Sequence, residues 1–187
     1  MTKNTKELEA RFLEIDTEQI KKKLKELGAN DLGEDVLYEI IFYDKALTWK
    51  SERRFVRLRK TRNGTFLSYK HKPKKESLDM EEVEILVDDW KKTKLLLERT
   101  GLVAYREQEK RRHTFRLGEV ICDIDTWPSV PSYLEIEGET EKAIKTTAES
   151  LGLSWNNAVF YGAGYILEHF YTIPVMSLHA FTFDRVE

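Results

Sequence analysis

Like-charged residues recur two positions apart in seven segments of this sequence. The seven pairs are Glu7 and Glu9, Arg57 and Arg59, Lys70 and Lys72, Glu82 and Glu84, Lys110 and Arg112, Asp123 and Asp125, and Glu135 and Glu137. Successive side chains of a β-strand point to opposite faces, so each pair would share one face of a strand. Like charges this close repel each other unless water or a counter-charge surrounds them. The pattern therefore indicates either a solvated face or a bound ligand.

The basic and acidic pairs suit two different partners. Arg and Lys side chains bind the oxygens of a polyanion directly. Arg11, on the same face as Glu7 and Glu9, adds one more cation to the basic pairs. Carboxylates repel a polyanion unless a divalent cation stands between them, and they are ligands that Mg²⁺ or Mn²⁺ accepts. Together these are the parts of a phosphoryl- or nucleotidyl-transfer site. The sequence has no Gly-rich phosphate loop, which excludes a P-loop or Rossmann site.

The charged pairs lie in segments whose alternate residues are apolar, which predicts β-strands. The predicted strands cover residues 6–15, 35–43, 54–61, 65–72, 80–87, 109–117, 119–126 and 133–139. Predicted helices begin after Asp16 and after Asp88 or Asp89, and cover residues 141–151 and 156–171. This order predicts an α+β fold. No linker divides the chain, so we expect a single domain over residues 1–187. Its peripheral tail, residues 172–187, would pack back or pair with a partner chain in a homodimer.

Composition narrows the classes of function. The 187 residues include 31 basic and 33 acidic side chains, for a net charge of -2, so there is no bulk basic excess for binding nucleic acid. The single cysteine, Cys122, excludes an internal disulfide and a cysteine-based metal site and is expected to pack in the core. No apolar run approaches the ~18 residues of a membrane span. We therefore expect a cytoplasmic protein that binds neither nucleic acid nor a membrane.

Two arrangements of the sheet fit the charged faces. In the first, the apolar face packs on helices and the charged face lies in water, as in ordinary half-buried antiparallel sheets. In the second, the sheet curls into a barrel with the charges inside and the helices outside. A solvated face would mix both signs with neutral polar residues, whereas here three strands carry basic pairs and four carry acidic pairs. The segregation favours the second arrangement, with a bound counter-charge.

An ordered set of motifs runs through most of the chain. The motifs are Glu7-Leu8-Glu9-Ala10-Arg11, Arg57-Leu58-Arg59, Lys70-His71-Lys72, Glu82-Val83-Glu84, Lys110-Arg111-Arg112, Asp125, Glu135-Ile136-Glu137-Gly138 and Gly164-Tyr165-Ile166-Leu167. This set, over about residues 5–170, resembles the CYTH domain, whose members are also called triphosphate tunnel metalloenzymes. The first motif is similar to the ExExK signature of that family, with Arg11 in place of Lys.

The resemblance implies an eight-stranded antiparallel β-barrel, a triphosphate tunnel with helices packed outside. It implies a divalent cation, Mg²⁺ or Mn²⁺, held by Glu7, Glu9, Asp125, Glu135 and Glu137. It implies a triphosphate held by Arg57, Arg59, Lys70, Lys72, Lys110 and Arg112, with Glu82 or Glu84 ordering water or a basic neighbour. The catalytic set it implies is Glu7, Glu9, Arg11, Lys110 and Arg112. Because Arg11 stays protonated, we expect it to bind charge rather than to act as a base.

Three functions follow from the resemblance. The leading hypothesis is a metal-dependent triphosphatase that hydrolyses inorganic, thiamine or nucleoside triphosphate. The alternative is a class IV adenylate cyclase that makes cyclic AMP and pyrophosphate from ATP, although residues 127–133 differ from the Gly-containing loop common in the cyclases. A second alternative is a non-catalytic polyphosphate- or nucleotide-binding module. Trp127, near the expected tunnel mouth, would either pack in its loop or stack on a base.

Overall fold

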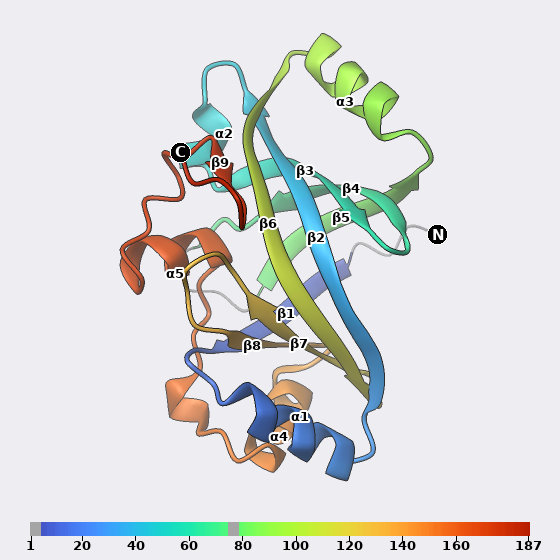
Figure 1. Cartoon of the computed structure of the whole chain (residues 1–187), viewed down its shortest axis with the longest axis vertical. Coiled ribbons are helices and arrows are strands. Elements are labelled where there is room, and N and C mark those ends of the chain that lie inside the picture. The colour runs from blue at the N-terminus through green and yellow to red at the C-terminus, as the bar shows by residue number, and fades with distance from the viewer. Residues whose placement is uncertain (1–4, 75–78) are drawn as a thin grey trace.

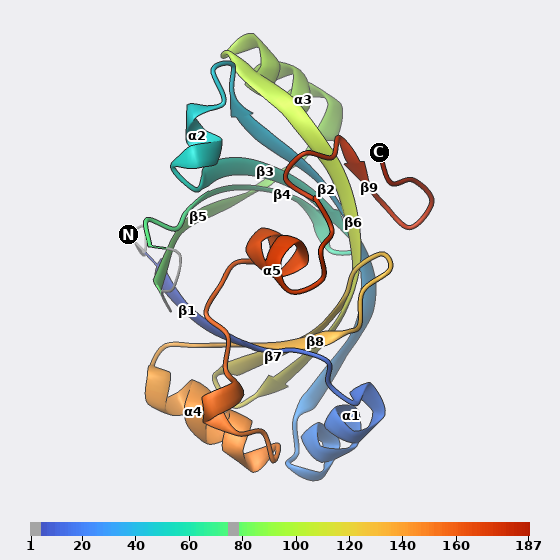
Figure 2. The same cartoon turned by 90° about the vertical axis from the view of Figure 1, so that its left-hand side faces the viewer.

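Eight antiparallel strands close into a ring (Figures 1 and 2). The computed structural model describes residues 5–74 and 79–187, without the side chains of residues 5–7, 79 and 80. The strands are β1 (Thr5–Phe12), β2 (Asn30–Asp44), β3 (Arg54–Thr61), β4 (Gly64–His71), β5 (Asp79–Val87), β6 (Leu102–Leu117), β7 (Val120–Thr126), β8 (Tyr133–Gly138) and β9 (Ala180–Phe181). Neighbours follow the order β2-β3-β4-β5-β1-β8-β7-β6, and β6 pairs with β2 to close the ring. The short β9 pairs with β6 in parallel.

The helices are α1 (Thr17–Glu26), α2 (Thr48–Ser51), α3 (Trp90–Arg99), α4 (Glu141–Ser150) and α5 (Ala163–His169), with a 3₁₀ turn at Trp155–Asn157. Asp16 caps α1, and Asp89 rather than Asp88 caps α3, because each carboxylate accepts a backbone N–H of the first turn. The predicted α+β fold is confirmed. No helix in the described part of the chain is long and apolar enough to cross a membrane.

The outer face of the ring carries the apolar side chains. Helices α1 and α4 cover β1, β7 and β8 (Figure 2), and the core between them is fully apolar. Its buried strand residues are Ala10, Phe12, Phe115, Val120, Cys122, Ile124, Leu134 and Ile136. A second core lies outside β2 and β3, where Ile40 and Leu58 pack with Trp90 and Leu97 of α3. Apolar residues therefore lie on the outside of the ring and charged residues on the inside, which is the barrel arrangement that the segregated charges favour.

Strands β2 and β6 are longer than the sequence pattern predicts. The two strands pair along their whole lengths, with irregularities between Asp31 and Gly33 and between Ile41 and Phe42. The irregularity between Asp31 and Gly33 lies outside the predicted strand 35–43, and a β-bulge there shifts which residues share a face. The predicted strands 35–43 and 109–117 are parts of the longer β2 and β6.

The predicted helix 156–171 is wrong in its first half. Val159 forms an antiparallel bridge with Arg11, and Gly162 is extended and precedes α5. Gly162 and Gly164 lower the helix propensity of this segment, so pairing with Arg11 replaces the helix that the sequence pattern predicts. Unlike the other helices, α5 lies across one opening of the ring (Figure 2).

The C-terminal segment packs back onto the ring. Val175 and Phe181 are buried in a third cluster with Trp127, Tyr133 and Leu167 of α5. Three backbone hydrogen bonds join His179 and Ala180 to Glu187, and β9 lies on β6. The segment after residue 171 therefore helps to hold α5 over the opening.

Candidate functional site

A cavity of about 650 Å³ lies inside the ring. The predicted site residues that line it are Glu9, Arg11, Arg57, Arg59, Lys70, Lys72, Glu82, Glu84, Lys110, Arg112, Glu135 and Glu137. Asp125 is fully buried behind this surface. The backbone of Glu7 belongs to β1, but its side chain lies outside the described residues. The ring thus brings residues from six strands to one space, because their period-two pairs all face inward.

Arg11 lies between two carboxylates on the β1–β8 side. Its Nη2 lies 2.8 Å from Glu9 Oε2 and 2.5 Å from Glu135 Oε2, and its Nη1 donates to the carbonyl of Tyr161 at 2.7 Å. Although burial opposes the charge, Glu135 and Glu9 raise the pKa of Arg11 above its usual value. Arg11 therefore stays charged and joins the acidic strands to the segment that leads into α5.

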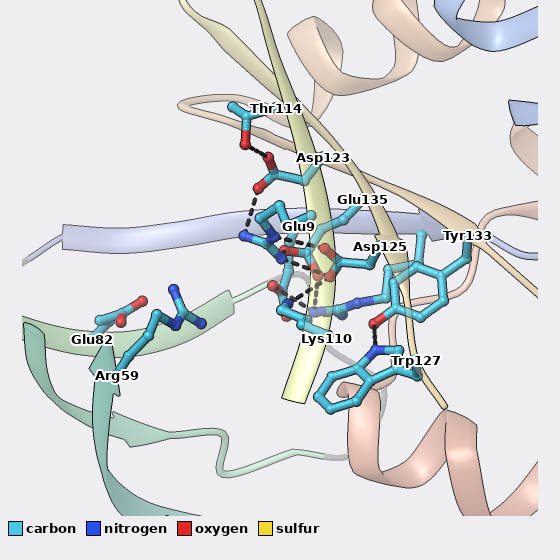
Figure 3. Close-up of polar contacts among 12 residues, drawn as sticks. Glu9, Arg59, Glu82, Lys110, Thr114, Asp123, Asp125, Trp127, Tyr133 and Glu135 are labelled. Carbon is cyan, nitrogen blue, oxygen red and sulfur yellow. Dashed lines mark hydrogen bonds and ion pairs between the residues drawn. The ribbon is translucent and has the colours of Figure 1, made fainter. Parts of the chain in front are cut away.

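Arg112 and Lys110 hold the carboxylates of β7, and Figure 3 labels Lys110, Asp123 and Asp125. Arg112 lies 2.5 Å from Asp123 and 2.6 Å from Asp125, and its Nη2 donates to Glu135 at 2.9 Å. Lys110 Nζ donates to Asp125 Oδ2 at 2.6 Å. Burial, together with neighbouring Arg112, lowers the pKa of Lys110 to about 8. These charges compensate each other inside the protein, which is the condition for burying them.

Glu137 is the exception on the acidic side. It has no hydrogen-bond or ion-pair partner among the described residues, although it faces the cavity. Burial and the nearby Glu135 raise the pKa of Glu137 to about 7. Glu9 lies directly opposite it in the β1–β8 register. An uncompensated carboxylate beside two others is a donor set that fits a hard divalent cation. The described residues do not already form a group of three such ligands around one point.

The β3, β4 and β5 side carries four of the predicted phosphate-binding residues, Arg57, Arg59, Lys70 and Lys72. Arg57 Nη2 donates to Glu82 and to Ser68 Oγ, each at 3.3 Å, and Lys70 also pairs with Glu82. Lys72 reaches across to Glu9 at 3.4 Å, so the two sides of the tunnel meet there. Burial lowers the pKa of Lys72. Glu82 thus lies between two basic neighbours, Arg57 and Lys70.

Four buried polar residues of the site were not predicted from the sequence. Glu39, Ser68, Arg106 and Gln108 are buried and polar, and all but Ser68 line the cavity. Arg106 and Gln108 continue the period-two face of Lys110 and Arg112 toward the start of β6, which would have revealed them if the strand had been predicted longer. Glu39 is flanked by the apolar residues Tyr38 and Ile40 and belongs to no period-two charged pair, so only its neighbours in the structure reveal its role.

Trp127 packs in its loop. Its Nε1 donates to the hydroxyl of Tyr133 at 2.8 Å, and its ring stacks on Phe181 with centroids 6.0 Å apart. Lys110 Nζ lies 5.4 Å from the ring centroid, so the indole also faces a site cation. Cys122 is fully buried in the outer core, and burial raises the pKa of its thiol to about 12, so packing is its role.

The chain belongs to the CYTH domain family, which matches residues 5–161. A protein of known structure from Pyrococcus horikoshii OT3 is 26% identical, with a TM-score of 0.69 over 81% of this chain and 93% of that one. A putative adenylate cyclase from Vibrio parahaemolyticus is 15% identical, with a TM-score of 0.76 over 89% of this chain and 99% of that one.

A third similar structure is a putative adenylyl cyclase from Hippeastrum, described as having a dominant triphosphatase activity. It is 16% identical, with a TM-score of 0.63 over 90% of this chain and 96% of that one. At this identity, as for the Vibrio protein, the likeness establishes the fold alone. No curated protein matches the sequence.

Proposed function

We propose that this protein is a divalent-metal-dependent triphosphatase whose substrate is inorganic, thiamine or nucleoside triphosphate. The observation that carries the proposal is a single cavity lined by cations of β3, β4 and β6 and by carboxylates of β1 and β8. Cations hold phosphate oxygens, and carboxylates hold the metal that substrate phosphates need. The activity described for the Hippeastrum structure supports hydrolysis on this fold.

The cation would be Mg²⁺ or Mn²⁺, and Glu9, Glu135 and Glu137 would hold it together with Glu7. Asp125 already binds Lys110 and Arg112, so it would act from behind these residues. A bound divalent cation would neutralise charge on the phosphates and polarise the phosphorus–oxygen bond that breaks.

The basic residues bind and orient the phosphate chain. Arg57, Arg59, Lys70 and Lys72 face the cavity from two adjacent strands, so they can contact successive phosphates of one extended chain. Water ordered by a carboxylate attacks the terminal phosphorus, and the bond from that phosphorus to its bridging oxygen breaks. The shortened phosphate chain leaves, and a proton of the water passes to the carboxylate. Arg11 contributes charge only, because its guanidinium stays protonated.

A metal-by-substrate panel tests the proposal. Purified protein in EDTA, Mg²⁺ or Mn²⁺ is incubated with tripolyphosphate, thiamine triphosphate or ATP, and phosphate, pyrophosphate and cyclic AMP are measured. We expect phosphate release that requires the metal. Cyclic AMP with pyrophosphate from ATP would instead identify a cyclase. Tight triphosphate binding without turnover under either metal would identify a binding module.

A further inference from the structure

The guanidinium of Arg59 is held by one nitrogen only. Its Nε donates to Glu39 Oε1 at 2.6 Å, whereas Nη1 and Nη2 have no hydrogen-bond or ion-pair partner among the described residues. Arg112 differs, because its Nη atoms already contact carboxylates. Arg59, labelled in Figure 3, lines the cavity, so its two terminal nitrogens leave a planar fork that can bind a ligand there.

Glu39 is the residue that produces this orientation. Its side chain is 2% exposed and accepts Gln108 Nε2 at 2.5 Å in addition to Arg59 Nε. Arg57 Nη1 lies 3.7 Å from the same Oε1, so one carboxylate lies between two guanidiniums. Two cations two residues apart on one strand face repel each other, and Glu39 offsets that repulsion. Despite its burial, Arg59 and Arg57 lower the pKa of Glu39, which keeps the carboxylate ionised.

The sheet register places Glu39 between its partners. Glu39 lies directly opposite Arg59 on β3 and directly opposite Gln108 on β6. Gln108 Oε1 accepts Arg106 Nε at 2.8 Å, and Arg106 Nη1 donates to the carbonyl of Val175 at 2.8 Å. The carboxylate is therefore held from both neighbouring strands, and the network reaches the C-terminal segment that supports α5.

We propose that Glu39 is a positioning residue, which binds Nε of Arg59 and so presents both Nη groups of that arginine to phosphate oxygens. The inference rests on the proposed function, because the ligand it requires is a triphosphate. Glu39 touches no phosphate in this arrangement and acts through Arg59.

Calorimetric titration with inorganic tripolyphosphate in EDTA tests this role without turnover. The proteins compared are wild type, Glu39→Gln, Arg59→Gln and the double variant. Losing the charge that orients Arg59 should weaken binding about tenfold or more, from the usual worth of a charged hydrogen bond. Because Glu39 acts through Arg59, the double variant should bind no more weakly than Arg59→Gln alone.

Glu107→Gln is the matched control. Glu107 lies on β6 at the outer face, where it pairs with Arg185 at 3.2 Å and is 39% exposed. Removing an exposed charge should leave the dissociation constant within about twofold of wild type. Thermal unfolding establishes that each variant folds. If Glu39→Gln does not fold, Glu39→Asp keeps the charge but withdraws it by one methylene, and should also weaken binding in an Arg59-dependent way.

The outcomes separate the two proposals. If wild type binds tripolyphosphate and Glu39→Gln binds equally well, or if the two losses add in the double variant, the positioning role is wrong and the proposed function stands. If wild type binds no tripolyphosphate in EDTA, the role of Glu39 is wrong, because Arg59 then binds no phosphate without the metal. If wild type also releases no phosphate from any substrate in Mg²⁺ or Mn²⁺, the proposed function is wrong as well.

Discussion

Two walls of the tunnel both bury charged side chains on their inner faces but differ on their outer faces. The packed wall, made of β1, β7 and β8, is covered by α1 and α4, and Leu134 and Ile136 on its outer face are fully buried. The open wall, made of β4 and β5, leaves Val83 at 50% and Ile85 at 53% exposure. On the inner faces, Glu9 and Glu82 are both buried. Burial of the charges therefore comes from closure of the ring, not from cover by helices.

The difference has a consequence for the chemistry. The packed wall holds Arg11 between Glu9 and Glu135, and also Glu137, which has no hydrogen-bond or ion-pair partner in the part of the chain that the structure describes. Carboxylates so close together repel one another, and a rigid core behind them prevents the strands from separating. On the open wall Glu82 lies between Arg57 and Lys70, so its charges compensate each other locally. We infer that the proposed metal site needs the packed wall.

Removing a carboxylate from the packed wall should have the largest effect on activity. Glu9→Gln keeps the shape but loses a charge that Lys72 and Arg11 contact and that the proposed cation needs. We expect metal-dependent phosphate release to fall by about 100-fold or more. Steady-state assays in Mg²⁺ and Mn²⁺ measure the effect, and circular dichroism checks the fold. A fully active variant would show that Glu9 does not belong to the metal site.

Truncating an outer-face residue should lower the free energy of unfolding more on the packed wall than on the open wall. Ile136→Ala opens a cavity in the core under α4 and should lower the free energy of unfolding by about 2–5 kcal/mol. Ile85→Ala removes a side chain that is 53% exposed and should cost less than about 1 kcal/mol. Urea unfolding of both variants measures the two costs. Equal costs would mean that the open wall is covered in solution.

The capping residues of α4 and α3 should give the smallest of the expected differences in stability. Thr140 caps α4, which buries Ile144 and Ala148, whereas Asp89 caps α3, whose side chains are at most partly buried. Thr140→Ala should lower global stability by about 1 kcal/mol, since α4 belongs to the packed wall's core. Asp89→Ala should fray α3 with a global cost below about 0.5 kcal/mol. Hydrogen exchange locates the fraying, and a global loss in Asp89→Ala as large as in Thr140→Ala would contradict this difference.

Much of the ring was predictable because strand periodicity is a local property. The pairs around Arg57, Lys70, Glu82 and Glu135 all face one cavity, as their spacing indicated. The helix starts at Asp16 and Asp89 were predictable for the same reason, because a cap is decided within one turn.

Only the tertiary structure decided which residues lie next to each other across the strands. Cross-strand register placed Arg11 between Glu9 and Glu135, buried Asp125 behind Lys110, and put Glu39 opposite Arg59. Pairing with Arg11 also shortened the last helix. The sequence by itself determined which residues share a face, because that depends on neighbours two positions away. The structure decided the partners across strands, because register depends on bulges, closure of the ring and the packing of the whole sheet.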